Sequence, residues 1–185
     1  MSKQFWNETL TWATSSGTAV ANTTTETIIF PNVTIPANYM ADGRSLRITA
    51  LGQYSTTGTP TLQFLLRWAG VSGTLICKTV ATTTGSGVTA ALWEVEIIGT
   101  VRSNGATGTI MANGHAHFGS ALTQAVGSAT GAGSYTNISN GGVLTPATAT
   151  LDFTADTALS ITCVWGTASA SNTLTGLNYI IEALN

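Results

Sequence analysis

Short stretches in which apolar and polar residues alternate recur along this chain, and glycine, proline, asparagine and serine separate them. The clearest stretch carries an apolar residue at every second position, at Leu62, Phe64, Leu66 and Trp68. A period of two places such residues on one face of a β-strand. No long window combines helical spacing of apolar residues with a capping residue. The pattern therefore predicts an all-β protein.

The spacing of the turns predicts how the strands are arranged. About nine or ten short strands, with turn signals every ten or so residues, are typical of an antiparallel two-sheet sandwich. Loops of uneven length favour a jelly-roll-like sandwich over an up-and-down barrel. Asn104–Gly105 predicts a tight hairpin between strands at 92–101 and 110–118. The polar run 166–172 predicts a second hairpin, between the last two strands.

The 185 residues fit one domain. Residues 1–24 are interpreted as an N-terminal arm, because large aromatic residues stand there in an otherwise polar stretch. Residues 25–185 are interpreted as a single jelly-roll-like β-sandwich domain.

Three aromatic residues of the arm, Phe5, Trp6 and Trp12, are candidate protein-contact residues. A strand is expected from Glu8 to Trp12, and its alternation places Leu10 and Trp12 on one face. We expect these rings to pack on the sandwich or on neighbouring protein, as aromatic residues do at interfaces.

Charge is scarce in this chain. Asp, Glu, Lys and Arg make up 8% of residues and the net charge is -2, whereas soluble domains average about 25% charged residues. A surface of hydroxyls and amides suits a protein packed against other proteins. Scattered cations disfavour direct nucleic-acid binding. No secretory signal is recognisable, and no apolar run reaches the length of a membrane span.

The two cysteines, Cys77 and Cys163, each lie in an apolar strand-like run. We expect buried free thiols that pack as small hydrophobic groups. The alternative is a cross-strand disulfide. No histidine or lysine stands beside either cysteine to activate it as a nucleophile.

His115 and His117 stand two apart in a predicted strand, so both imidazoles point to one side. Cupin-type metal enzymes use such a pair, but they add a nearby glutamate and a third histidine. This chain has two histidines in all and no acid directly after the pair, so the metal triad is incomplete and no cofactor is expected. The pair is interpreted as strand residues or as subunit-interface contacts, for instance around a symmetry axis.

Glu94 and Glu96 also share one strand face, and we expect a solvated face with an ion pair to Arg67 or Arg102 rather than glycosidase chemistry. The chain has neither a Gly-x-Ser-x-Gly nor a Gly-x-x-x-x-Gly-Lys motif. We therefore expect no enzyme activity.

Three further tryptophans, Trp68, Trp93 and Trp165, are expected in the core because they stand in strong strand patterns. The stretch 119–142 is predicted to be a long loop, with one short strand at most, and loops of this length are usually functional or mobile. Its single aromatic residue, Tyr135, is a further candidate contact residue.

Six turn-and-strand segments together resemble β-sandwich structural proteins of tailed bacteriophages. They are Ile35–Asn38, Gly43–Ile48, Thr57–Leu62, Trp93–Glu96, Val101–Thr109 and Trp165–Thr173. The resemblance extends over residues 25–183. It implies a non-enzymatic virion component, made in the host cytoplasm, and it assigns no functional residue because the matching residues are structural.

The first hypothesis is a capsid decoration (cement) protein on the capsid surface of the virion. Its partners would be the major capsid protein and further copies of itself in a homotrimer, with neither direct nucleic-acid binding nor membrane binding. The arm and the 119–142 loop would make the contacts, and summed weak contacts would reinforce the head. The alternative is a phage tail or fibre module, or a carbohydrate-binding host-recognition protein.

Overall fold

The computed structural model describes residues 7–119, 134–139 and 148–184. Within these ranges the chain forms strands and loops and no helix. The predicted all-β antiparallel sandwich of two sheets is confirmed. The strands are β1 (Asn7–Trp12), β2 (Val20–Ala21), β3 (Thr27–Ile28), β4 (Val33–Ile35), β5 (Ser45–Ser55), β6 (Thr61–Trp68), β7 (Thr74–Thr79), β8 (Thr82–Thr83), β9 (Ala91–Ser103), β10 (Gly108–Phe118), β11 (Ser134–Ser139), β12 (Thr148–Leu151), β13 (Thr157–Trp165) and β14 (Thr173–Leu184).

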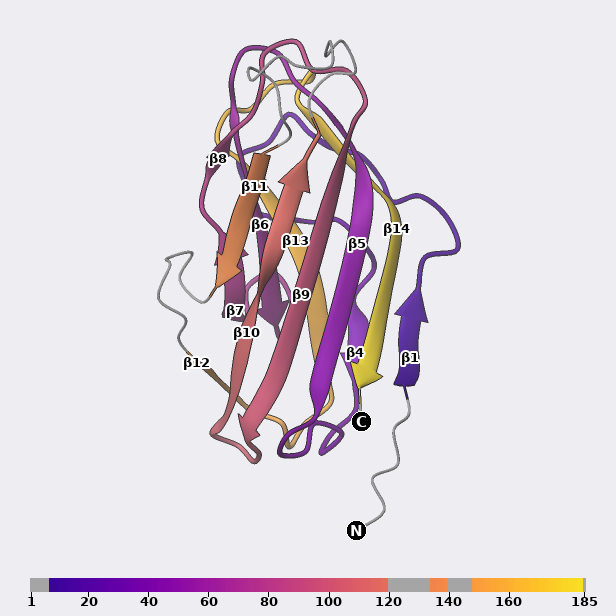
Figure 1. The fold of residues 1–185 in the computed structure, drawn as a ribbon, viewed down its shortest axis with the longest axis vertical. Coiled ribbons are helices and arrows are strands. Elements are labelled where there is room, and N and C mark those ends of the chain that lie inside the picture. The colour runs from indigo at the N-terminus through magenta and orange to yellow at the C-terminus, as the bar shows by residue number, and fades with distance from the viewer. Residues whose placement is uncertain (1–6, 120–133, 140–147, 185) are drawn as a thin grey trace.

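The larger sheet has the order β1-β14-β5-β9-β10-β11, with β2 on β14 and β12 on β10. The smaller sheet, β7-β6-β13-β3, lies behind it in Figure 1 and also holds β4 and β8. Strand β11 pairs with both β10 and β7, so it joins the two sheets along one side. The chain crosses between the sheets after β2, β4, β5, β8, β12 and β13.

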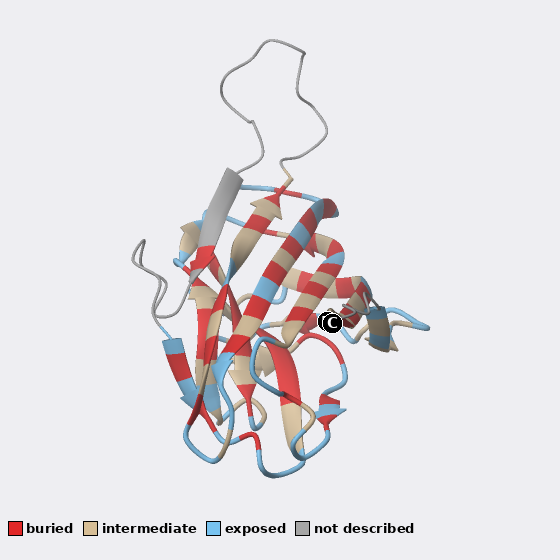
Figure 2. Cartoon of the chain, turned by 60° about the horizontal axis from the view of Figure 1, so that its bottom comes forward, coloured by how far each residue is buried: buried red, intermediate tan, exposed pale blue. Residues whose placement is uncertain are grey.

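The core lies between the two sheets, and buried and exposed residues alternate along the strands, as Figure 2 shows in red and pale bands. The predicted apolar stripe of β6 is fully inside, with Leu62, Phe64, Leu66 and Trp68 each at most 4% exposed. Trp68, Trp93 and Trp165 are all buried, as expected. The rings of Phe64 and Trp93 lie 4.8 Å apart between centroids.

A glycine makes room for the largest core side chain. A Cβ atom on Gly52 in β5 would lie 2.0 Å from the carbonyl oxygen of Thr175 and 2.7 Å from two indole carbons of Trp93. Gly52 is paired with Trp93 across β5 and β9. The indole therefore occupies the space that a side chain at position 52 would fill.

Of the two predicted hairpins, the structure contains one and not the other. The hairpin at Asn104–Gly105 is confirmed, because β9 and β10 pair along their length on either side of it. The hairpin predicted at 166–172 is wrong. Strand β13 pairs with β6 in the smaller sheet, whereas β14 pairs with β5 in the larger one. A connection of this length can span the ~10 Å between packed sheets as readily as it can close a hairpin.

The described part of the N-terminal stretch pairs with the sandwich. Strand β1 is the edge of the larger sheet beside β14, and β2 pairs with β14 further along. Tyr39, between β4 and β5, contacts β1 through a hydrogen bond, because its hydroxyl donates to Glu8 Oε2 at 2.5 Å. The Arg44 guanidinium lies 4.3 Å above the centroid of the Tyr39 ring. Burial and the hydrogen bond to Glu8 raise the pKa of Tyr39 to about 12. The division at residue 24 stays a prediction.

The expected alternation of β1 is wrong after Leu10. The register of β1 against β14 shifts between Thr9 and Thr11, so Leu10 is the extra residue of a β-bulge. Leu10 packs against the core, but Trp12, two residues later, is 60% exposed. One inserted residue inverts the alternation, so Leu10 and Trp12 do not share a face.

Both cysteines are free and buried, as expected. Burial raises the pKa of each thiol, to about 12 for Cys163, where the charge of Glu26 contributes as well. The thiolate form that a nucleophile needs is therefore strongly disfavoured at neutral pH. None of the described residues forms a helix long and apolar enough to cross a membrane.

Candidate functional site

The outer face is defined here as the side of the larger sheet that points away from the smaller sheet. Large hydrophobic residues that are exposed concentrate on it. Of the five such residues in the described ranges, Leu51, Leu92 and Ile98 point outward from β5 and β9. Trp12 stands on the edge strand β1, and Val80 follows β7 in the other sheet. Leu92 is 64% exposed and stands between buried Ala91 and Trp93, which fixes its outward direction.

Charged groups on the outer face are arranged in cross-strand pairs. His115 in β10 stands opposite Glu96 in β9, and His117 stands opposite Glu94. His115 Nε2 lies 4.0 Å from Glu96 Oε2. On the neighbouring strands, Arg47 Nη1 lies 3.8 Å from Glu182 Oε2. Arg47 and Glu182 balance each other's charge, whereas an imidazole opposite Glu94 or Glu96 carries a charge only when it is protonated. Exposed pairs of this kind contribute little to stability.

His115, His117, Glu94 and Glu96 thus form one cluster across β9 and β10. No group of three or more His, Cys, Asp or Glu side chains in the described ranges is positioned to hold a metal ion. The expected ion pair of a glutamate at 94 or 96 with Arg67 is wrong, since Arg67 lies in β6 of the other sheet. There its Nη2 contacts Glu26 Oε2 at 2.7 Å.

The Arg67–Glu26 pair lies on the smaller sheet and is partly buried. Arg67 donates from Nε to Oε1 at 2.9 Å and from Nη2 to Oε2 at 2.7 Å, a bidentate geometry. Thr162 donates to the same Oε1 at 2.5 Å. Burial by itself raises the pKa of Glu26, but the hydrogen bonds from Arg67 and Thr162 and the charge of Arg67 outweigh it. The pKa of Glu26 is therefore below its usual value.

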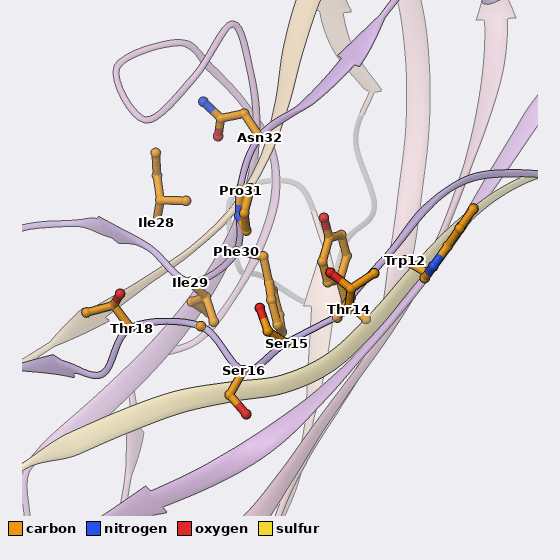
Figure 3. A pocket seen from close by; sticks show the side chains of 13 residues that line it. Trp12, Thr14, Ser15, Ser16, Thr18, Ile28, Ile29, Phe30, Pro31 and Asn32 are labelled. Carbon is orange, nitrogen blue, oxygen red and sulfur yellow. The ribbon is translucent and has the colours of Figure 1, made fainter.

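A pocket of about 410 Å³ lies beside the end of β1. Two segments form its walls, residues 12–18 and residues 28–32, and Tyr179 of β14 lies between them. Figure 3 shows Trp12 at one end of the pocket and Thr18 with Ile28 at the other. None of the described residues that line it carries a charge.

The pocket has a buried aromatic floor and an exposed hydroxyl rim. The rings of Phe30 and Tyr179 stack with centroids 4.4 Å apart, and both are at most 6% exposed. Thr14, Ser15 and Ser16 along the opposite wall are exposed.

The predicted contact residues divide between three situations. Trp12 is exposed and lines the pocket, and His115 and His117 are half-buried on the outer face. Tyr135 lies in β11 opposite His117, and its side chain is outside the described part. Phe5 and Trp6 lie outside the described residues. The predicted short strand within 119–142 is present as β11.

Sequence reasoning missed Leu51, Leu92 and Ile98 as candidate contact residues. Each is a large apolar residue at a position where the strand alternation predicts a polar one. That mismatch is a usable signal, because an apolar residue out of phase with a buried stripe must point to solvent or to a partner. It also missed the pocket, whose walls are brought together only by the fold.

No protein-family model matches the sequence, and no curated protein matches it. Among solved structures the chain is similar to the CBM2 module of the evolved Dit of Lactobacillus casei BL23 phage J-1. That similarity covers 99% of this chain and 98% of the other, with 9% sequence identity and a TM-score of 0.40. Values this low transfer no function.

Proposed function

We propose that this protein is a non-enzymatic structural protein of a tailed-bacteriophage virion, a capsid decoration protein that binds the lattice of the major capsid protein through the outer face. The observation that carries the proposal is the concentration of exposed Leu51, Leu92 and Ile98 on one side of one sheet. The phage-like turn and strand segments of the sequence supply the virion context.

The chemistry of the outer face suits protein docking. Interface cores are apolar and aromatic, with few unpaired charges. On the outer face Arg47 stands beside Glu182, and the imidazoles of His115 and His117 stand opposite Glu96 and Glu94. Docking would therefore cover carboxylates that have a basic side chain opposite them, while exposed leucine and isoleucine side chains lose contact with water.

The mechanism is mechanical. One sheet face offers only a modest apolar area, so a single copy would bind weakly. Three copies in a homotrimer would engage neighbouring capsid subunits at once, and each further contact forms at a high effective concentration. A shell joined by such trimers would resist the outward pressure of packaged DNA.

The test uses heads of the encoding phage that lack this protein. Purified protein is added, and the particles are imaged by cryo-electron microscopy. Regular density over the capsid lattice, with the outer face turned to the shell, is the expected result. Bare heads, with the protein at the tail instead, would favour the tail or fibre alternative and overturn the decoration proposal.

A matched pair of variants tests the outer face itself. Leu92→Ser removes an apolar group that is 64% exposed on the outer face, and Val80→Ser removes one that is 51% exposed on the other sheet. We expect Leu92→Ser to weaken head binding by about tenfold, as for a central interface residue, and Val80→Ser to leave it unchanged. Equal binding by the two variants would contradict docking through this face.

A further inference from the structure

We propose that the pocket beside Trp12 binds a neutral saccharide of one or two sugar rings. The pocket measures about 410 Å³, near the lower end of the ~300–1,000 Å³ typical of small-molecule sites. The proposal concerns the purified protein alone, so it does not depend on the docking function proposed above.

The lining gives the chemical class of the ligand. Among the described residues no Asp, Glu, Lys, Arg or His lines the pocket, so these residues offer no counter-ion to a carboxylate, phosphate or amine. A buried ionic ligand without a counter-charge would be penalised by desolvation. A neutral ligand with many hydroxyls and some apolar surface matches an aromatic floor and a hydroxyl rim.

Trp12 supplies the feature most specific to sugars. The C–H groups on one face of a pyranose ring are slightly positive and pack on the negative face of an aromatic ring. At 60% exposure the indole keeps a large free area at one end of the pocket (Figure 3). The β-bulge at Leu10 is the cause, because it turns Trp12 out of the core.

The polar rim suits the hydroxyl groups of a sugar. Thr14, Ser15, Ser16 and Thr18 line the wall that follows Trp12, and their hydroxyls can both donate and accept hydrogen bonds. On the other wall Ser160 donates to Asn32 Oδ1 at 2.7 Å. That bond fixes the amide and leaves its Nδ2 end as a donor for a ligand.

Backbone hydrogen bonds to β14 hold the wall formed by residues 12–18 in place. The amides of Ala13 and Gly17 donate to the carbonyl oxygens of Tyr179 and Gly176 at 2.9 and 2.8 Å. A Cβ on Gly17 would lie 2.6 Å from the carbonyl oxygen of Ile29. The wall can approach this closely only with glycine at position 17. A preformed wall reduces the ordering cost of binding.

A second glycine forms the floor. A Cβ on Gly176 would lie 2.4 Å from two ring carbons of Phe30. Its absence lets Phe30 lie flat over β14 and stack on Tyr179. Substitution of either glycine would distort the pocket as well as the fold, so neither is used in the test below.

The experiment screens the full-length protein on a glycan array carrying neutral and acidic saccharides. The best neutral disaccharide is then titrated by protein NMR, which also reports whether each variant is folded. The variants are Trp12→Ala, Trp12→Phe and, as a matched exposed control outside the pocket, Leu92→Ala.

The expected result is binding of a neutral saccharide, with shifts at Trp12 and the 14–18 wall. Trp12→Ala should weaken it at least about tenfold, with partial recovery in Trp12→Phe and no change in Leu92→Ala. Three outcomes would overturn the proposal. They are no neutral saccharide bound at millimolar concentration, equal binding by folded Trp12→Ala and Leu92→Ala, and preference for an acidic saccharide over its neutral counterpart.

Discussion

The two faces of the larger sheet are made by the same strands but follow different rules. On the inner face, Leu46, Ile48 and Trp93 are at most 2% exposed, and the packing leaves no room for a side chain at Gly52. On the outer face, Leu92 and Ile98 stand next to buried neighbours, yet they remain 64% and 40% exposed. Close packing restricts which side chains fit on the inner face. On the outer face, contact with water restricts the choice of side chain only weakly.

This difference shows where function can reside. A change on the inner face alters stability first, because close-packed cores tolerate neither cavities nor extra atoms. A change on the outer face or at the pocket rim is expected to alter binding with little effect on folding. Substitutions taken from the inner face outward should reveal that separation.

Removing the central indole should have the largest effect. Trp93→Ala is expected to lower the free energy of unfolding by about 3–5 kcal/mol, through lost burial and the cavity left behind. Trp93 Nε1 has no hydrogen-bond partner among the described residues, so Trp93→Phe should cost clearly less. Urea unfolding followed by circular dichroism measures both variants, and equal losses would contradict the packing argument.

Adding one methyl group to the inner face should cause the second-largest loss of stability. Gly52→Ala is expected to cost about 1–3 kcal/mol, because the new Cβ meets Trp93 and a backbone oxygen. Gly43→Ala is the matched control. Its φ of +79° strains an alanine backbone, but nothing lies within 4 Å of its Cβ. In thermal unfolding Gly52→Ala should show the lower Tm, and the reverse order would refute the steric account.

The ion pair on the smaller sheet should have a moderate, pH-dependent effect. The folded-state pKa of Glu26 is below the ordinary value of 4.5. Its stabilisation is therefore fully present above pH 4.5 and is lost as the pH falls through the folded-state pKa. Glu26→Gln should cost about 1 kcal/mol at pH 7.

The same variant should reduce the loss of stability between pH 5 and pH 3 relative to the unmodified protein. Denaturant unfolding across that range measures the slope. Glu182→Gln, at the longer and more exposed pair with Arg47, is the control and should alter the slope less. Identical pH profiles for Glu26→Gln and the unmodified protein would rule out this role.

A substitution on the outer face should change the stability very little. Leu92→Ser is expected to change the free energy of unfolding by less than about 0.5 kcal/mol, as for other exposed positions. Its head binding should nevertheless fall. A stability loss as large as that of Gly52→Ala would place Leu92 in the core network and remove the distinction between the two faces.

Local pattern was enough to predict much of the fold. The stripe from Leu62 to Trp68, the three buried tryptophans and the hairpin at Asn104–Gly105 follow from alternation and turn chemistry within a few residues. The buried free cysteines follow from the apolar runs around them. Of the candidate site, the sequence identified Trp12 and the histidine pair but not their surroundings.

Contacts between distant segments decided the rest. The assignment of β13 and β14 to different sheets, the choice of Glu26 as the partner of Arg67 and the pocket between residues 12–18 and 28–32 all depend on such contacts. The bulge at Leu10 depends on how β1 fits the edge of β14. The sequence by itself determined which residues alternate and where the chain turns, since those preferences are local. Only the tertiary structure determined which strands pair beyond the hairpin at Asn104–Gly105 and where apolar residues out of phase with the buried stripes, such as Leu92, face water. The reason is that the burial of the whole core selects among locally equivalent arrangements.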